Sequence, residues 1–167
     1  MPVTSSGTAK VTLPADDQIL ITREFDAPKH LVYKAFTTPE LVKRWWHANR
    51  GEMTVAEIDL QVGGKWRYVM IADGGMEVGF HGEYREIVPN ERIVSTETFE
   101  GLPEGVSEED GTTVNTATFT EADGRTTLAL LVQAPSKATR DAIVDSGMEA
   151  GLQDALDNLE QVAVSLG

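Results

Sequence analysis

Residues 146–166 read SGMEAGLQDALDNLEQVAVSL, and this stretch decides the fold. Its apolar side chains recur every three or four residues and fall on one helical stripe roughly 120° wide. They are Met148, Leu152, Ala155, Leu156, Leu159, Val162, Ala163 and Leu166. Ser146 and Glu149 have the spacing of a capping box, which places the helix start at Ser146. The opposite face is polar and rich in acids, so it is interpreted as solvated. The sequence therefore predicts a long amphipathic helix that must bury its stripe against another element.

The rest of the chain is interpreted as one domain. A chain of 167 residues is long enough for a single core. Small and polar residues dominate 1–17, so we expect a flexible N-terminal tail there, in which Val11 and Leu13 could add a short edge strand. The folded domain is expected to span 18–167.

Composition excludes several classes of function. Cysteine is absent, which excludes disulfides, thiolate metal sites and cysteine nucleophiles. No apolar run is long enough to cross a bilayer, and no secretory leader is recognised, so we expect a soluble cytoplasmic protein without membrane insertion. A net charge of −13 repels phosphate backbones, which argues against nucleic acid as a partner.

The first half of the domain predicts one strand followed by two short helices. From Gln18, alternation places Ile19, Ile21 and Phe25 on one face, interrupted only by Arg23. Proline and acidic residues in 26–28 and 38–40 then mark the starts of two short helices. The tryptophan pair Trp45 and Trp46 lies at the end of the second.

A meander of antiparallel strands follows. Apolar residues alternate in six further stretches, namely 56–62, 66–70, 78–88, 93–99, 112–120 and 125–134. Glycine, proline and aspartate turns separate most of them, whereas 100–111 is an acidic, glycine-containing segment expected to be an exposed loop. The fold class is therefore α+β, with an antiparallel sheet of about six to seven strands and its helices gathered on one face.

Several motifs in this order resemble a known family. They are FDAP at 25–28, WW at 45–46, DLQVGGKWR at 59–67, GEYREI at 82–87, PNERIV at 89–94 and GMEAG at 147–151. Together they are similar to the Activator of Hsp90 ATPase homologue 1-like domain of the START-like, polyketide cyclase-type superfamily. The resemblance implies a helix-grip fold, in which a curved antiparallel sheet wraps around the C-terminal helix and an apolar cavity. The chain departs from the family after the tryptophan pair and at Leu152, where a tryptophan is common.

If the sheet wraps around the helix, one set of side chains is expected to line the cavity. These are Trp45, Trp46, Trp66, Tyr68, Met70, Phe80, Tyr84, Phe99, Phe119, Met148, Leu152 and Leu156. The alternative interpretation is that they fill an ordinary core in mutual contact. Composition does not distinguish a hollow core from a filled one.

The histidines and the charged strand residues give no site of their own. His30, His47 and His81 lack a second ligand at the spacing of zinc motifs, so no metal, cofactor or catalytic residue is assigned. Alternation places His81 on the face opposite Phe80 and Tyr84. The set Asp59, Arg67, Glu83 and Arg85 is interpreted as cross-strand pairs on the outer face of the sheet.

Three functions remain open. The leading hypothesis is a binding protein that encloses a small apolar or aromatic molecule between sheet and helix. An enzyme of the polyketide cyclase or hydrolase type on the same fold is the first alternative, and a co-chaperone-like protein-binding module is the second. An enzyme should show at least two convergent polar groups with perturbed pKa values, whereas a protein-binding module should show an exposed patch. A homodimer and a protein partner both stay open.

The entrance to the cavity is expected near Trp45, Trp46 and the loop 100–111. Adjacent tryptophans on a short helix do not point into one core, and the loop has little apolar surface to anchor it. At least one of the two indoles is therefore predicted to be partly exposed.

Overall fold

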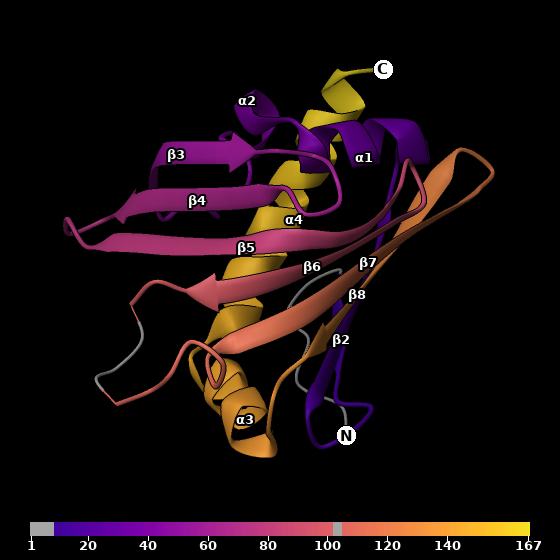
Figure 1. The fold of residues 1–167 in the computed structure, drawn as a ribbon. Helices are drawn as coiled ribbons and strands as arrows, with labels where there is room; N and C mark the ends of the chain where they lie inside the picture. The colour runs from indigo at the N-terminus through magenta and orange to yellow at the C-terminus, as the bar shows by residue number, and fades with distance from the viewer. Residues whose placement is uncertain (1–8, 102–104) are drawn as a thin grey trace.

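The computed structural model describes residues 9–101 and 105–167 and has the predicted α+β architecture (Figure 1). A single antiparallel sheet has the strand order β1-β2-β8-β7-β6-β5-β4-β3. Within the described residues the sheet has 8 strands, slightly more than the six or seven expected. Every neighbouring pair is antiparallel, as a meander with short turns requires.

The elements follow the predicted order. The strands are β1 (Lys10–Thr12), β2 (Gln18–Phe25), β3 (Gly51–Ile58), β4 (Lys65–Ala72), β5 (Glu77–Val88), β6 (Arg92–Phe99), β7 (Thr112–Ala122) and β8 (Arg125–Gln133). The helices are α1 (Lys29–Thr37), α2 (Pro39–Val42), α3 (Lys137–Asp145) and α4 (Met148–Ser165).

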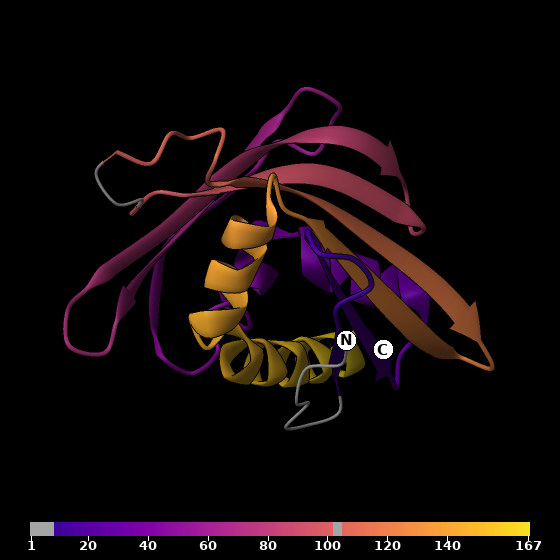
Figure 2. The same cartoon turned by 90° about the horizontal axis from the view of Figure 1, so that it is seen from below.

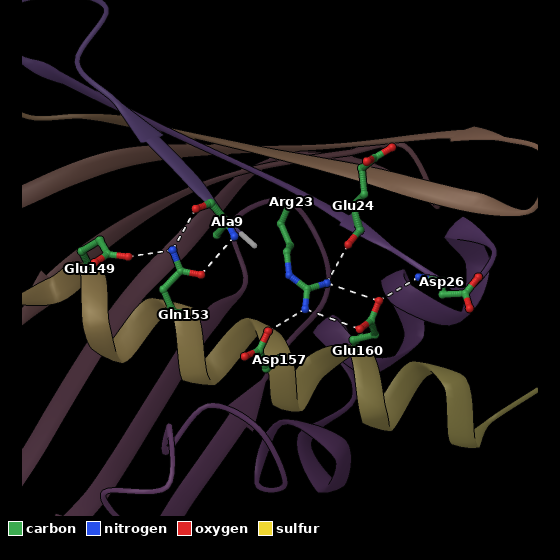
Figure 3. Close-up of polar contacts among 8 residues, drawn as sticks. All are labelled: Ala9, Arg23, Glu24, Asp26, Glu149, Gln153, Asp157 and Glu160. Atoms are coloured by element: carbon green, nitrogen blue, oxygen red, sulfur yellow. Dashed lines mark hydrogen bonds and ion pairs between the residues drawn. The ribbon is translucent and has the colours of Figure 1, made fainter. Parts of the chain in front are cut away.

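Part of the N-terminal segment belongs to the sheet. Residues 1–8 of the expected tail lie outside the described residues, but Lys10–Thr12 pair with β2 as an edge strand. Val11 is fully buried, and the backbone of Ala9 exchanges two hydrogen bonds with the side-chain amide of Gln153 on α4, at 3.0 and 2.8 Å (Figure 3). The alternation at Val11 and Leu13 therefore marks a strand.

β3 is displaced toward the N-terminus relative to the predicted stretch 56–62, since it begins at Gly51. It ends at Ile58, and the next two apolar residues of the pattern, Leu60 and Val62, are exposed in the loop to β4. The turn causes this, because Gly63 has a φ of 84° and donates its N–H to Tyr84 O of β5. The apolar alternation of the sequence therefore continues past the end of β3.

The sheet curves over α3 and α4 (Figure 2). The predicted stripe of α4 faces the concave side of the sheet, and Leu156, Leu159 and Val162 are buried at its centre. Met148 and Leu152, at the N-terminal end of the stripe, are only partly buried. The helix-grip arrangement is therefore present, and α4 seals the concave face better at its C-terminal half.

The capping-box prediction was wrong. α4 begins at Met148 after Gly147, which has a φ of 83°, and no side chain caps it. α3 runs up to Asp145, so Ser146 ends that helix and donates its hydroxyl to Ile143 O at 2.6 Å. Two consecutive helices need a sharp bend between them, and a left-handed glycine supplies it without strain.

The polar face of α4 is not simply solvated. Arg23 points inward from β2 and is buried, its guanidinium bonded to Asp157 at 2.7 Å and to Glu160 at 3.3 Å (Figure 3). It also lies 4.8 Å from the ring centroid of Phe25, where the π face attracts the cation. Together with Gln153, these contacts attach α4 to the β1–β2 edge.

Truncation of the buried stripe tests this packing. Leu156→Ala should lower the free energy of unfolding by about 2–5 kcal/mol, because the side chain is removed from a packed environment. Urea denaturation followed by circular dichroism measures the change. Val164→Ala, on the exposed side of the same helix, is the control and should change stability by less than about 0.5 kcal/mol. Equal effects would contradict the assigned orientation of α4.

Two arginines that pair with α4 give a second test. Arg23→Ala removes a buried cation and should cost about 1–3 kcal/mol, because the carboxylates of Asp157 and Glu160 keep 52% and 31% exposure and can be solvated once the arginine is gone. Arg50→Ala removes a pair to Asp154 of 2.8 Å in which both side chains are close to half exposed, at 46% and 45%. That pair should contribute only about 0–1 kcal/mol. Thermal or urea unfolding of both variants checks the order, and a larger loss for Arg50→Ala would contradict the role given to Arg23.

Candidate functional site

The concave face of β4 to β7 presents aromatic and polar side chains toward α4. Tyr68 of β4 is paired with Phe80 of β5, which is paired with Phe99 of β6, so the three side chains share one face. Because alternate residues of a strand share a face, Glu97 lies on this face as well. Its partner on β7 is Thr113.

The predicted cavity-lining residues form two groups. In the first, the ring of Trp46 meets those of Tyr68 and Phe80 edge to face, both at 5.6 Å between centroids. Trp66 lies 4.8 Å from Tyr68, and Phe80 lies 5.1 Å from Phe99. These five rings form one connected aromatic wall on the concave face.

The second group packs under α1. Trp45 stacks on Phe36 at 5.7 Å and donates its indole N–H to Ala35 O at 3.0 Å. Phe119 meets Phe36 and Tyr33 edge to face at 5.6 and 5.5 Å. Trp45 and Phe119 are both buried, so they belong to the packed end of the core, apart from the aromatic wall.

Side chains of the aromatic wall keep partial exposure although a helix covers their face. Trp46, Phe80 and Phe99 are partly exposed, as are Met148 and Leu152 on α4. Met70, Tyr84 and Leu156, also predicted to line the cavity, are buried. We call the region between the aromatic wall and the N-terminal half of α4 the hollow, and consider it as the candidate site because of these partly exposed side chains.

Glu97 is the polar residue in the hollow that sequence analysis missed. Burial raises its pKa, an effect that the neighbouring Asn115 amide partly offsets. Its side chain nevertheless retains some solvent access, as expected for a residue that lines a space. The signal was present, because Ile93, Ser95, Glu97 and Phe99 have the same parity along β6.

Two tyrosines accompany Glu97. Burial raises the pKa of Tyr68 well above its usual value, and the nearby Tyr84 and Glu97 raise it further. Burial likewise raises the pKa of Tyr84. Both phenols are therefore neutral near pH 7 and able to donate or accept hydrogen bonds. Tyr68 thus interacts with both Tyr84 and Glu97, and the pKa values of all three groups are raised.

Gly82 makes room for one ring of the wall. A side chain there would clash with Thr96 O and with Nε1 of Trp66, at 1.8 and 2.6 Å from the Cβ position. The indole N–H of Trp66 crosses this gap and bonds to Thr96 O at 3.1 Å. The Trp66 ring is therefore fixed beside the backbone that carries Glu97.

The convex face carries the charged set. His81 lies there as predicted, with Nδ1 3.0 Å from Glu100, and Arg67 bonds Glu100 through two nitrogens at 2.9 Å. Lys65 and Glu83 pair at 3.8 Å. A surface depression that is open to solvent runs beside these side chains, and Lys65 and Glu83 pair within it.

No metal site is found in the described part of the chain. Among residues 9–101 and 105–167, no cluster of three or more histidine, aspartate or glutamate side chains could hold an ion. No described helix is long and apolar enough to cross a membrane.

The family model described as "Activator of Hsp90 ATPase homolog 1-like protein" matches residues 26–163. The chain belongs to this family. The match includes α1 to β8 and most of α4, so it covers the strands and the helix that form the hollow. A search of curated proteins finds no match.

Solved structures share the fold of this family member. A crystal structure of a protein from Rhodobacter sphaeroides is 24% identical, covers 95% of this chain and 99% of its own, and superposes with a TM-score of 0.84. One from Chromobacterium violaceum is 27% identical, covers 89% and 98%, and has a TM-score of 0.76. A solution structure from Arthrobacter aurescens is 22% identical, covers 95% and 92%, and has a TM-score of 0.82. The helix-grip fold is therefore shared by proteins of low sequence identity.

The ion cluster on the convex face predicts a pH dependence. Bonds from Arg67, and then from His81, lower the pKa of Glu100 from 4.5 to about 2. A carboxyl whose folded-state pKa is depressed stabilises the protein above its unfolded-state pKa, and the stabilisation is lost between pH 4.5 and about 2.

Glu100→Gln should therefore be less stable than the wild type by about 1 kcal/mol at pH 7, since the cluster is partly exposed. The difference should shrink as the pH falls from 4.5 to about 2, measured by urea unfolding at each pH. Glu83→Gln, which loses only the exposed pair to Lys65, is the control. A difference that is constant with pH would refute the assigned pKa of Glu100.

Proposed function

We propose that the protein binds a small apolar or aromatic molecule in the hollow. The observation that carries this proposal is the partial exposure of Trp46, Phe80 and Phe99 on a face that α4 covers. Aromatic rings stabilise a fold when neighbouring side chains pack against them. Rings whose surface is only partly covered in this way are available to contact a ligand. Each square ångström of apolar surface they bury on binding contributes about 25 cal/mol.

Membership of the family supports this proposal in general terms. START-like domains include ligand-binding and polyketide cyclase-like modules, and the present chain has the same sheet and helix. The site residues we assign to binding are Trp46, Trp66, Tyr68, Phe80 and Phe99 on the sheet side, with Met148 and Leu152 on α4.

Acid–base catalysis is the second candidate, and the three groups Glu97, Tyr68 and Tyr84 favour it. A carboxylate of raised pKa beside neutral phenols is a suitable general base. Recovery of a bound compound after prolonged incubation separates the two functions: an unchanged compound supports a binding protein, and a converted compound supports an enzyme.

The exposed apolar residues give less support to a protein-binding role. Leu60, Val62, Met76, Val106 and Val164 come from three different loops and from α4. Single exposed apolar side chains are common on protein surfaces. Within the described residues, they provide no argument for a co-chaperone-like surface.

Tryptophan fluorescence tests the binding proposal. Trp46 is the partly exposed indole, whereas Trp45 and Trp66 are buried at 6% and 7% exposure. Titration with bicyclic aromatic compounds should change the emission of the wild type, Trp45→Phe and Trp66→Phe, and the change should be mostly lost in Trp46→Phe. Leu152→Trp, which fills the hollow, should reduce affinity at least about tenfold by removing space for the ligand. Binding that survives both substitutions unchanged would refute the proposed site.

A further inference from the structure

The polar side chains of the hollow lie at two cross-strand pairs of β6 and β7. Ser95 of β6 pairs with Asn115 of β7, and Glu97 pairs with Thr113, so all four side chains face the same way. Thr113 donates its hydroxyl to the Asn115 side-chain oxygen at 2.9 Å, which turns the Asn115 amide nitrogen to other partners. Glu97 is the only one of the four that can carry a charge.

No described cation faces Glu97. The neighbours that affect its ionisation are its apolar surroundings and Asn115, and no basic side chain contributes. Two described bases that are buried have other partners: Arg23 bonds Asp157 and Glu160, and Arg140 bonds Asp141 and the carbonyls of Ala15 and Gln18. The ionisable group that interacts with Glu97 is Tyr68, which is itself an acid.

The aromatic rings on the same face as Glu97 also favour a cation. Trp66 is fixed beside Glu97 by its bond to Thr96 O, and Tyr68 lies 4.8 Å from Trp66. Phe99 lies two residues along the same strand and contacts Phe80. Aromatic faces attract organic cations through the ring quadrupole, most strongly where water is excluded. A carboxylate on the same face of the sheet as these rings therefore favours a positively charged group.

We propose that the ligand of the hollow is an organic amine, whose ammonium group pairs with Glu97 while its apolar body lies against Trp46, Phe80 and Phe99. This inference rests on the proposed binding function and names the ligand class. The ammonium supplies the counter-charge that Glu97 lacks, and Tyr68 and Ser95, which share the face of Glu97, carry hydroxyls that can accept its other protons. A fatty acid or another anion would place a second negative charge beside Glu97, which disfavours that class of ligand.

Three compounds that share a naphthalene ring but differ in charge test whether charge or shape determines binding. 2-Naphthylmethylamine is a cation at pH 7, 2-naphthalenemethanol is its neutral analogue, and 2-naphthoate is an anion. Isothermal titration calorimetry at pH 7 should give the order amine, alcohol, naphthoate. The amine should bind at least about tenfold more tightly than the alcohol, as one hydrogen bond to a charged group contributes.

Glu97→Gln should reduce the amine-to-alcohol affinity ratio to near one. Glu86→Gln is the matched control, because Glu86 is an exposed glutamate on the outer face of β5, paired with Arg92 at 3.3 Å. It lowers the net negative charge equally and should keep the wild-type ratio. Glu97→Gln should fold, because the raised pKa of Glu97 means that its charged form costs folding free energy near pH 7. Glu97→Leu is the second variant for the same comparison.

The outcomes distinguish this inference from the function on which it rests. Equal binding of amine and alcohol to the wild type overturns the amine assignment but leaves the binding site in place. If the preference for the amine over the alcohol persists in Glu97→Gln, or is lost equally in Glu86→Gln, the preference arises from general surface charge. Either result also overturns the inference. Failure of all three compounds to bind overturns the proposed function as well.

Discussion

Burial of one face of α4 by a strongly curved sheet is the constraint on which the rest of the structure depends. Leu156, Leu159 and Val162 bury against the concave face, while Arg23 and the backbone of Ala9 hold the polar side of the helix at the β1–β2 edge. The helix is thus attached along one side and at its C-terminal half. Met148 and Leu152 in its N-terminal half are only partly buried, and the proposed hollow lies there.

The position of the hollow explains its chemistry. The strands that curve away from α4 bring their inward side chains together, so the rings of Trp46, Phe80 and Phe99 share the space with Glu97. A single carboxylate within an aromatic wall is unfavourable for folding, because burial raises its pKa and no described base offsets it. Groups that reduce stability in this way are concentrated at functional sites, which supports the assignment of Glu97 to ligand recognition.

Family membership and the site carry different information. The family model and the solved structures show a helix-grip fold, and proteins of about one-quarter identity retain it. A fold shared at this distance supports many functions, so the ligand must be argued from the side chains of this chain. The ligand class we propose rests on Glu97, on the rings that share its face and on the pairing of Arg23 and Arg140 with other groups.

The amino-acid sequence by itself determined the class of the fold, the amphipathic stripe of α4 and the outward orientation of His81 and Arg67, because these follow from local periodicity. Tertiary structure decided the features that depend on residues distant in the chain. Ser146 ends α3 instead of capping α4, because a second helix precedes it directly. Trp45 and Trp46 are neighbours that pack into different groups, since α1 and β4–β5 approach them from opposite sides. The parity of Glu97 could be read from β6, but its lack of a cation could not, because that depends on where Arg23 and Arg140 find their partners in space.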